Sequence, residues 1–178
     1  MIESDVTEKA ATALLDLAAD RPWRDITLLE VARHAGLDLT ELYGCVQSKT
    51  TLLATVSRDL DKAALRTSAK GSEDIHDRLF DAIMARVEAM EPHRVALTKI
   101  AREAGPYVAL HFPATARALL EAAGLEATPP RLAGMVVTWA RVAQVWRDDE
   151  GALNRTMSEI DKRLRQLRAN LGRVRAGF

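Results

Sequence analysis

Apolar residues recur along the chain at intervals of three and four, which is the spacing of one face of an α-helix. The first such stretch ends at Pro22, and its apolar face consists of Val6, Ala10, Ala13, Leu14 and Leu17. The alternation of apolar and polar residues that is typical of a β-strand never extends beyond a few residues. The pattern therefore predicts an all-α protein.

Two short helices are predicted directly after this first one. Thr27 with Glu30 three residues later is a capping-box pattern, and it predicts a helix over about 28–35. Gly36 ends this helix, because glycine readily adopts the left-handed backbone that closes a helix. A further helix follows over about 38–45. Two short helices joined by a sharp turn and preceded by a longer helix predict a helix-turn-helix.

Ser48 is expected to cap a fourth helix that continues to about residue 68. The clearest interruption of the chain follows it, at Lys70, Gly71 and Ser72. We therefore predict a helix-turn-helix domain over 1–48, a joining helix over 49–68 and a C-terminal domain over 72–178.

The same periodicity predicts further helices beyond this interruption, over about 75–90, 93–104 and 113–123. A long penultimate helix begins near Pro129, and a last helix follows Gly151. The last helix carries a seam of apolar residues with coiled-coil-like spacing, namely Leu153, Met157, Ile160, Leu164, Leu167 and Leu171.

The composition is that of a soluble globular protein, with 48% apolar and 28% charged residues among 178. Cys45 is the one cysteine, which excludes an internal disulfide. The acidic start of the chain does not resemble a signal peptide, and no uncharged run is long enough for a membrane span. We expect a cytoplasmic protein without an integral membrane segment.

Charge is distributed unevenly although the net charge is zero. Residues 1–60 carry a net charge of −4, whereas residues 152–178 carry +5. The basic residues of the last segment, which include Lys162, Arg168 and Arg175, are expected to form a solvated helix face. Contact with anionic lipid is the alternative interpretation.

The inventory of reactive side chains argues against an enzyme. The four histidines of the chain are scattered and lack the i, i+4 pairing of a metal site. They are His34, His76, His93 and His111. The sequence contains neither a nucleophile elbow nor a glycine-rich phosphate loop. We expect no catalytic activity, no metal and no cofactor.

The residues from Trp23 to Leu37, followed by Leu42, Tyr43, Ser48 and Lys49, resemble the N-terminal domain of the tetracycline-repressor (TetR) family. The resemblance implies an N-terminal three-helix helix-turn-helix domain and a C-terminal helical domain for ligand binding and dimerisation. It also implies that double-stranded operator DNA and a small hydrophobic ligand are binding partners.

The resemblance implies contacts to DNA phosphates from Thr27, Tyr43 and Lys49, and hydroxyl and ammonium groups suit such contacts. Thr40 and Glu41 of the third helix are further candidates, because Glu41 can accept a hydrogen bond from cytosine N4. Two of these residues also have a purely structural interpretation. Thr27 can act as a helix cap alone, and Lys49 can be a solvated lysine.

The third helix departs from the pattern of the family. Asp38 and Glu41 place carboxylates where phosphates would approach. Leu39, Gly44 and Cys45 replace side chains that in the family contact bases or backbone. Neutralisation of phosphates supplies much of the affinity for DNA, so these departures weaken the expectation of DNA binding.

In a dimer of the TetR type, the last two helices meet their counterparts in a four-helix bundle. The expected interface residues are Trp139, Trp146, Leu153, Met157, Ile160 and Leu164. Large aromatic residues often anchor interfaces, but the two tryptophans can equally fill the core. The resemblance also implies a ligand pocket, and its expected lining is Phe80, Met84, His93, Tyr107, His111, Phe112 and Met135.

A second resemblance concerns residues 146–164, among them Asp149 and Thr156. It is to TetR-fold proteins that assist ubiquinone biosynthesis by binding lipid. An alternative interpretation is that Asp148, Asp149 and Glu150 only end a helix. The sequence thus predicts a TetR-like, ligand-responsive transcriptional regulator, with a quinone- or lipid-binding accessory protein that has lost DNA binding as the alternative.

Overall fold

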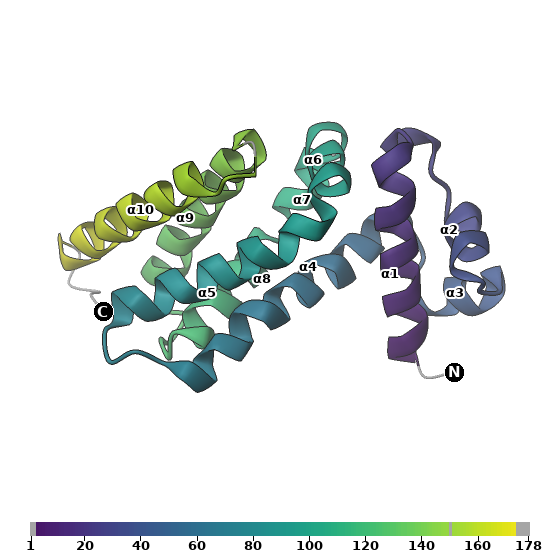
Figure 1. Cartoon of the computed structure of the whole chain (residues 1–178). Coiled ribbons are helices and arrows are strands. Elements are labelled where there is room, and N and C mark those ends of the chain that lie inside the picture. The colour runs from purple at the N-terminus through teal and green to yellow at the C-terminus, as the bar shows by residue number, and fades with distance from the viewer. Residues whose placement is uncertain (1–2, 150, 174–178) are drawn as a thin grey trace. The chain divides into compact units, whose positions relative to one another are not determined.

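The computed structural model describes residues 3–149 and 151–173. Within these ranges every regular element is a helix (Figure 1), which confirms the all-α prediction. Glu150, which we expected near the end of the penultimate helix, and Arg175 of the basic segment lie outside the described residues.

Two compact units make up the chain, and each is discontinuous in sequence. The first comprises Met1–Asp59 and His93–His111, and the second comprises Leu60–Pro92 and Phe112–Phe178. The interruption at residues 70–72, where we predicted a domain boundary, thus lies within the second unit. The functional division into a DNA-binding domain and a ligand and dimerisation domain stays a prediction.

The first unit contains the predicted helix-turn-helix and two additional helices from the middle of the chain. Its elements are α1 (Glu3–Asp20), the 3₁₀ turn η1 (Trp23–Asp25), α2 (Leu28–Ala35), α3 (Leu39–Cys45), the beginning of α4 (Lys49–Arg66), α6 (Arg94–Glu103) and α7 (Gly105–Ala109).

Helix α1 is the element on which the first unit is assembled. It packs against α2, α3 and α6. The apolar face predicted for it is confirmed, because Val6, Ala10 and Leu14 are at most 1% exposed. From α3, Leu42 is also fully buried. Burial of such residues provides the main driving force for folding, so α1 fixes the position of the helix-turn-helix.

Helix α7 was not predicted from the sequence. The predicted helices left residues 105–112 without one, but Pro106 occupies the first turn of this short helix. Proline is tolerated there, because the first amide groups of a helix have no acceptor within it. The earlier helix, expected over 93–104, is α6 with a preceding 3₁₀ turn, η3 (Glu91–His93).

The second unit contains the end of α4 and the remaining helices. These are η2 (Thr67–Lys70), α5 (Ile75–Met90), α8 (Phe112–Ala122), α9 (Pro129–Asp148) and α10 (Asn154–Arg173). Helices α9 and α10 lie side by side (Figure 1), and α8 packs against both α5 and α9. The fully buried side chains at the centre are those of Leu79, Ile83, Leu119, Leu120, Met135 and Ile160.

Gly134 permits the close approach of α9 and α10. A Cβ atom at this position would lie 2.3 Å from Cδ1 of Leu167. Leu167 is itself only 4% exposed, and its side chain would have to shift to make room for a larger residue at position 134. Glycine at residue 134 therefore accommodates the Leu167 side chain where the two helices meet.

A buried ion pair connects α4 and α5 in the core of the second unit. Nε of Arg86 donates to Oδ1 of Asp61 at 2.7 Å. The guanidinium also lies 4.3 Å from the ring centroid of Trp139 and donates to Oγ1 of Thr115 at 3.3 Å. Because Arg86 is 4% exposed and Asp61 is 6% exposed, each charge depends on the other for compensation.

We expect Arg86→Met to lower the free energy of unfolding by about 3–5 kcal/mol, because it leaves Asp61 as a buried, uncompensated charge. The double variant that adds Asp61→Leu removes both charges and should recover most of that loss. Urea denaturation of the two variants and the parent measures both effects. A single variant as stable as the parent would show that the pair is dispensable.

Candidate nucleic-acid interface

The turn between α2 and α3 has the backbone geometry of a helix-turn-helix. Gly36 adopts the left-handed conformation, with φ of 65°, and the amide of Leu37 donates to the carbonyl of Ala32 at 2.9 Å. Glycine adopts such a φ without steric cost. Beyond the turn, Oδ1 of Asp38 accepts from the amides of Thr40 and Glu41, at 2.8 and 3.3 Å.

The exposed side of α3 carries polar and aromatic side chains together with Leu39, which is 37% exposed. Thr40 and Glu41 are exposed, and Tyr43 is 58% exposed. The two amide donors lower the pKa of Asp38, so this carboxylate remains charged at the N-terminus of the helix. Its position is favourable because the helix dipole is positive at that end. Asp38 thus has a structural role as a helix cap, and Thr40, Glu41 and Tyr43 are the side chains available to a partner.

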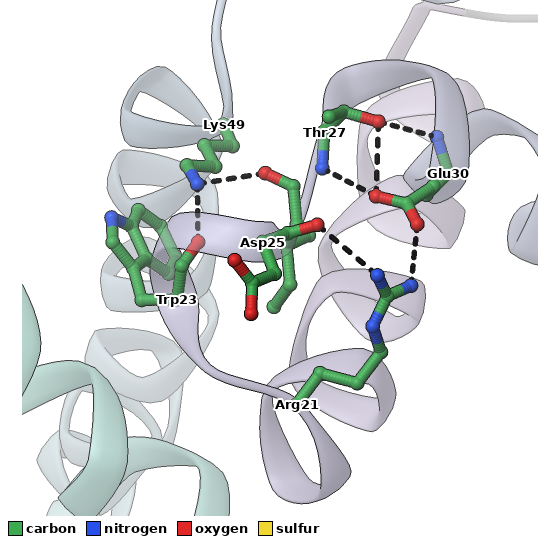
Figure 2. A network of polar contacts seen from close by, with 7 residues as sticks. Arg21, Trp23, Asp25, Thr27, Glu30 and Lys49 are labelled. Carbon is green, nitrogen blue, oxygen red and sulfur yellow. Dashed lines mark hydrogen bonds and ion pairs between the residues drawn. The ribbon is translucent and has the colours of Figure 1, made fainter.

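Thr27 and Glu30 form the predicted capping box, which is therefore confirmed (Figure 2). Oγ1 of Thr27 accepts from the amide of Glu30 at 3.2 Å. In return, Oε2 of Glu30 accepts from the Thr27 amide at 2.8 Å and from its hydroxyl at 3.0 Å. The hydroxyl of Thr27 thus both donates and accepts a hydrogen bond within the protein, although the side chain is exposed.

Arg21 extends this network from the end of α1. Its Nη1 lies 2.5 Å from Oε1 of Glu30, and its Nη2 donates to the carbonyl of Asp25 at 3.2 Å. Arg21 and the donors of Thr27 together hold the pKa of Glu30 below its usual value. The carboxylate of Glu30 therefore connects α1 with the beginning of α2.

Lys49 points into the protein rather than away from it (Figure 2). Its Nζ donates to the carbonyl of Trp23 and, at 2.7 Å, to the carbonyl of Ile26. The same nitrogen lies 4.6 Å from the ring centroid of Trp23. Burial lowers the pKa of Lys49, against the opposing effect of Asp25, Glu30 and Glu103.

The backbone of Trp23 has a second charged partner that the sequence did not indicate. The amide of Trp23 donates to Oε2 of Glu103 at 2.7 Å. Glu103 stands at the end of α6, 80 residues further along the chain, and no local pattern connects the two positions. Sequence reasoning therefore missed Glu103 as part of this region.

The residues expected to line a ligand pocket are divided between the two units. Met135 is fully buried in the second unit, where Phe80, Met84 and Phe112 are half-buried. His93, Tyr107 and His111 belong to the first unit, and Tyr107 is 50% exposed. The pocket stays a prediction.

Most residues of the expected dimer interface are buried within their own unit. Trp139 and Trp146 are each 2% exposed, and Ile160 and Leu164 are fully buried. The indole nitrogen of Trp146 donates to Oε1 of Glu91. Leu153 is half-buried and Met157 is 41% exposed. The two tryptophans thus occupy core positions, which was the alternative interpretation of their spacing.

An open groove of about 430 Å³ lies between α9 and α10. Its walls include Pro130, Val137 and Leu167, with Gln166 and Asn170 as polar members. Val137 is 61% exposed. Sequence reasoning placed none of these residues at an interface, because it selected the inward face of each helix.

Two searches of the described residues gave negative results. No helix among them is both long and apolar enough to cross a bilayer. They also contain no cluster of three or more His, Cys, Asp or Glu side chains that could hold a metal ion.

Solved structures similar to this chain are transcriptional regulators. A TetR transcriptional regulator from Rhodococcus sp. RHA1 superposes with a TM-score of 0.72 at 19% identity, covering 94% of this chain and 97% of that one. DhaS, a dihydroxyacetone kinase operon activator, superposes with a TM-score of 0.60 at 11% identity. The match covers 94% of this chain and 96% of DhaS. The TetR-family repressor AlkX from Dietzia sp. superposes with a TM-score of 0.52 at 17% sequence identity. The match covers 90% of this chain and 95% of AlkX.

The chain has the TetR fold.

Comparison of this TetR-fold sequence with protein-family models and with curated proteins gave no match. The resemblance to the ubiquinone-biosynthesis proteins is not confirmed. Asp149 and Thr156, which that resemblance included, have a structural role instead. Oδ2 of the buried Asp149 accepts from the amide and hydroxyl of Thr156, at 2.9 and 2.8 Å, and so caps the first turn of α10.

The contribution of Glu30 to the stability of this TetR-fold chain should depend on pH. Because the folded-state pKa of Glu30 is lowered from 4.5, its contribution is complete above about that pH and is lost as the pH falls through the folded-state pKa. The stability difference between the parent and Glu30→Gln should therefore shrink on acidification, as measured by denaturation at several pH values. Glu121→Gln, at an exposed position on α8, controls for the loss of one charge. A difference that is constant down to acidic pH would contradict the proposed network.

Proposed function

We propose that this TetR-fold chain is a ligand-responsive transcriptional regulator that binds double-stranded DNA through α2 and α3. The observation that carries the proposal is the turn at Gly36, which joins two capped helices and leaves the outer face of α3 to a partner. The major groove of DNA admits an α-helix presented in this way. A regulator of this kind acts in the cytoplasm, and the proposal includes no catalytic step.

Three exposed residues of α3 are the proposed DNA contacts. Tyr43 donates its phenol to a phosphate, and Thr40 offers a second hydroxyl. Glu41 accepts from the exocyclic amine of cytosine, which favours a cytosine at that position of the operator. Thr27 stands at the N-terminus of α2, where hydroxyl and amide groups suit a phosphate.

The charge of this region implies binding that is less sensitive to salt, and depends more on contacts to bases, than the binding of a basic helix-turn-helix. The acidic balance of residues 1–60 limits the neutralisation of phosphates that supplies non-specific affinity. Arg24 in η1 and Arg33 in α2 are exposed cations of this region. With so few cations, a working site depends more on contacts to bases than a basic helix-turn-helix does.

We further propose that the chain forms a homodimer through the outward faces of α9 and α10. Pro130, Ala133 and Val137 are exposed and follow one face of α9 at helical spacing. They border the groove against α10, which a second copy would fill. Two copies related by a two-fold axis then present two recognition helices to a palindromic operator.

Regulation is proposed to arise from a small hydrophobic ligand bound among the helices of the C-terminal half. A ligand that binds one conformation more tightly than another shifts the population between them. DNA affinity changes by the same coupling free energy. The AlkX repressor, described as implicated in the biodegradation of n-alkanes, is consistent with an apolar ligand for a protein of this fold.

DNA binding is tested by fluorescence anisotropy, with DNA from upstream of the protein's own gene and random DNA as comparison. We expect a preference for the upstream DNA, and an affinity that falls as the salt concentration rises, with a shallow slope because few phosphates are neutralised. Absence of binding to either DNA at low salt would overturn the proposal.

Tyr43→Phe should weaken binding to upstream and random DNA alike, by roughly threefold to tenfold, because it removes a hydroxyl donor from a phosphate. Ser158→Ala, which removes an exposed hydroxyl from α10, is the matched control and should bind as the parent does. Unchanged affinity in Tyr43→Phe would exclude the proposed contact.

Val137→Glu should weaken the homodimer by about tenfold or more, because burial of a carboxylate without a partner is unfavourable. Analytical ultracentrifugation at several protein concentrations measures this change. Leu65→Glu is the control, since Leu65 is an exposed apolar residue on α4, 41% exposed. Equal dissociation constants for the two variants would place the interface elsewhere.

A further inference from the structure

The peptide segment that leads into α2 is held by charged side chains on both sides of one residue. The amide of Trp23 donates to Oε2 of Glu103 at 2.7 Å. Its carbonyl accepts from Nζ of Lys49, as Figure 2 shows. Lys49 begins α4 and Glu103 ends α6. The backbone of Trp23 is therefore fixed between two elements that are distant in sequence.

Helix α6 contacts the end of α1 through a further charged group. Nζ of Lys99 donates to the carbonyl of Ala19 at 2.7 Å. Ala19 lies in the last turn of α1, where the carbonyl groups have no N–H donor within the helix and accept from another group. Together, Lys99 and Glu103 attach one helix to both sides of the junction between α1 and η1.

The contacts of the Lys49 side chain are all made to groups of the protein itself and suit a structural role. Its ammonium group donates to two backbone carbonyls and lies over an indole ring. Both residues that supply the carbonyls are buried, Trp23 at 8% and Ile26 at 1% exposure. A contact from Lys49 to a DNA phosphate would take this donor away from carbonyls in a poorly solvated region, which is unfavourable.

We propose that Lys49 and Glu103 are positioning residues, which act through the segment Trp23–Ile26 to fix the beginning of α2 and do not themselves contact DNA. The inference rests on the proposed DNA-binding function. It assigns to Lys49 a role different from the phosphate contact that the family resemblance implies. It also makes α6 part of the DNA-binding apparatus, although α6 is remote from the helix-turn-helix in sequence.

The salt dependence of DNA binding distinguishes the two roles of Lys49. Loss of one phosphate contact lowers the slope of log affinity against log salt by about 0.9. Loss of a positioning residue weakens binding without changing that slope, because the number of neutralised phosphates is unchanged. We therefore expect Lys49→Met to bind a random duplex roughly fivefold to tenfold more weakly, with the parent slope, between about 50 and 200 mM salt.

Two controls accompany this measurement. Lys162→Met removes one exposed cation from α10 and should leave both affinity and slope unchanged. Ile160→Val weakens the packing of the second unit slightly, and it shows whether a general loss of stability alone reduces affinity. A slope lowered by about one in Lys49→Met would overturn the proposal and restore the phosphate contact.

Variants of Glu103 test the other half of the proposal. Glutamine retains a carbonyl oxygen that can accept from the Trp23 amide, whereas alanine does not. Glu103→Ala should weaken DNA binding about as much as Lys49→Met, and Glu103→Gln should restore most of the affinity. The effects of Glu103→Ala and Lys49→Met should also be less than additive, because both act on one peptide segment. Equal losses in the alanine and glutamine variants would contradict the role of Glu103.

Amide hydrogen exchange provides a readout that does not need DNA. In Lys49→Met and Glu103→Ala, exchange should accelerate in residues 23–31, while the segments of α9 and α10 keep the protection of the parent. Unchanged exchange in 23–31 would overturn the positioning role. If exchange accelerates but the parent binds no DNA even at low salt, the positioning role is supported and the proposed function fails.

Discussion

The two helices of the helix-turn-helix are too short to be stable by themselves, and this constraint determines how the first unit is built. Helix α2 has eight residues and α3 has seven, whereas isolated helices in water need roughly 12–15 residues even to be marginal. Their ends are therefore bound by specific groups. Glu30 satisfies the start of α2, Gly36 closes it, and Asp38 satisfies the start of α3. With the ends of both helices fixed in this way, apolar packing against α1 provides the remaining stabilisation.

Charged side chains have different structural roles in the two units. In the first unit, charged groups lie at helix ends and satisfy backbone donors and acceptors. In the second, Asp61 and Arg86 lie in the middle of an apolar core and satisfy each other. A buried pair of this kind contributes little net stability compared with well-packed apolar residues. A shift of α4 along α5 would separate these two charges and leave each of them buried without its partner.

Local features of the fold could be predicted from the sequence, and features that depend on distant residues could not. The capping box and the glycine turn are patterns within ten residues, and both are confirmed. The helix α5 follows from its apolar spacing in the same way. In contrast, the bond from Trp23 to Glu103 joins residues 80 positions apart. The spacing of Trp139 and Trp146 showed that they share a face, but only the packing shows that this face is buried.

The composition of the first unit has a consequence for the order in which the chain folds during synthesis. Residues His93–His111 belong to this unit but follow the first segment of the second one, Leu60–Pro92, along the chain. A nascent chain that has emerged only as far as α4 contains the whole helix-turn-helix, yet it lacks Lys99 and Glu103, which fasten the α1–η1 junction. Domains generally fold as units during translation. Here the bonds from α6 to Ala19 and Trp23 can form only after α5 and α6 have both been made.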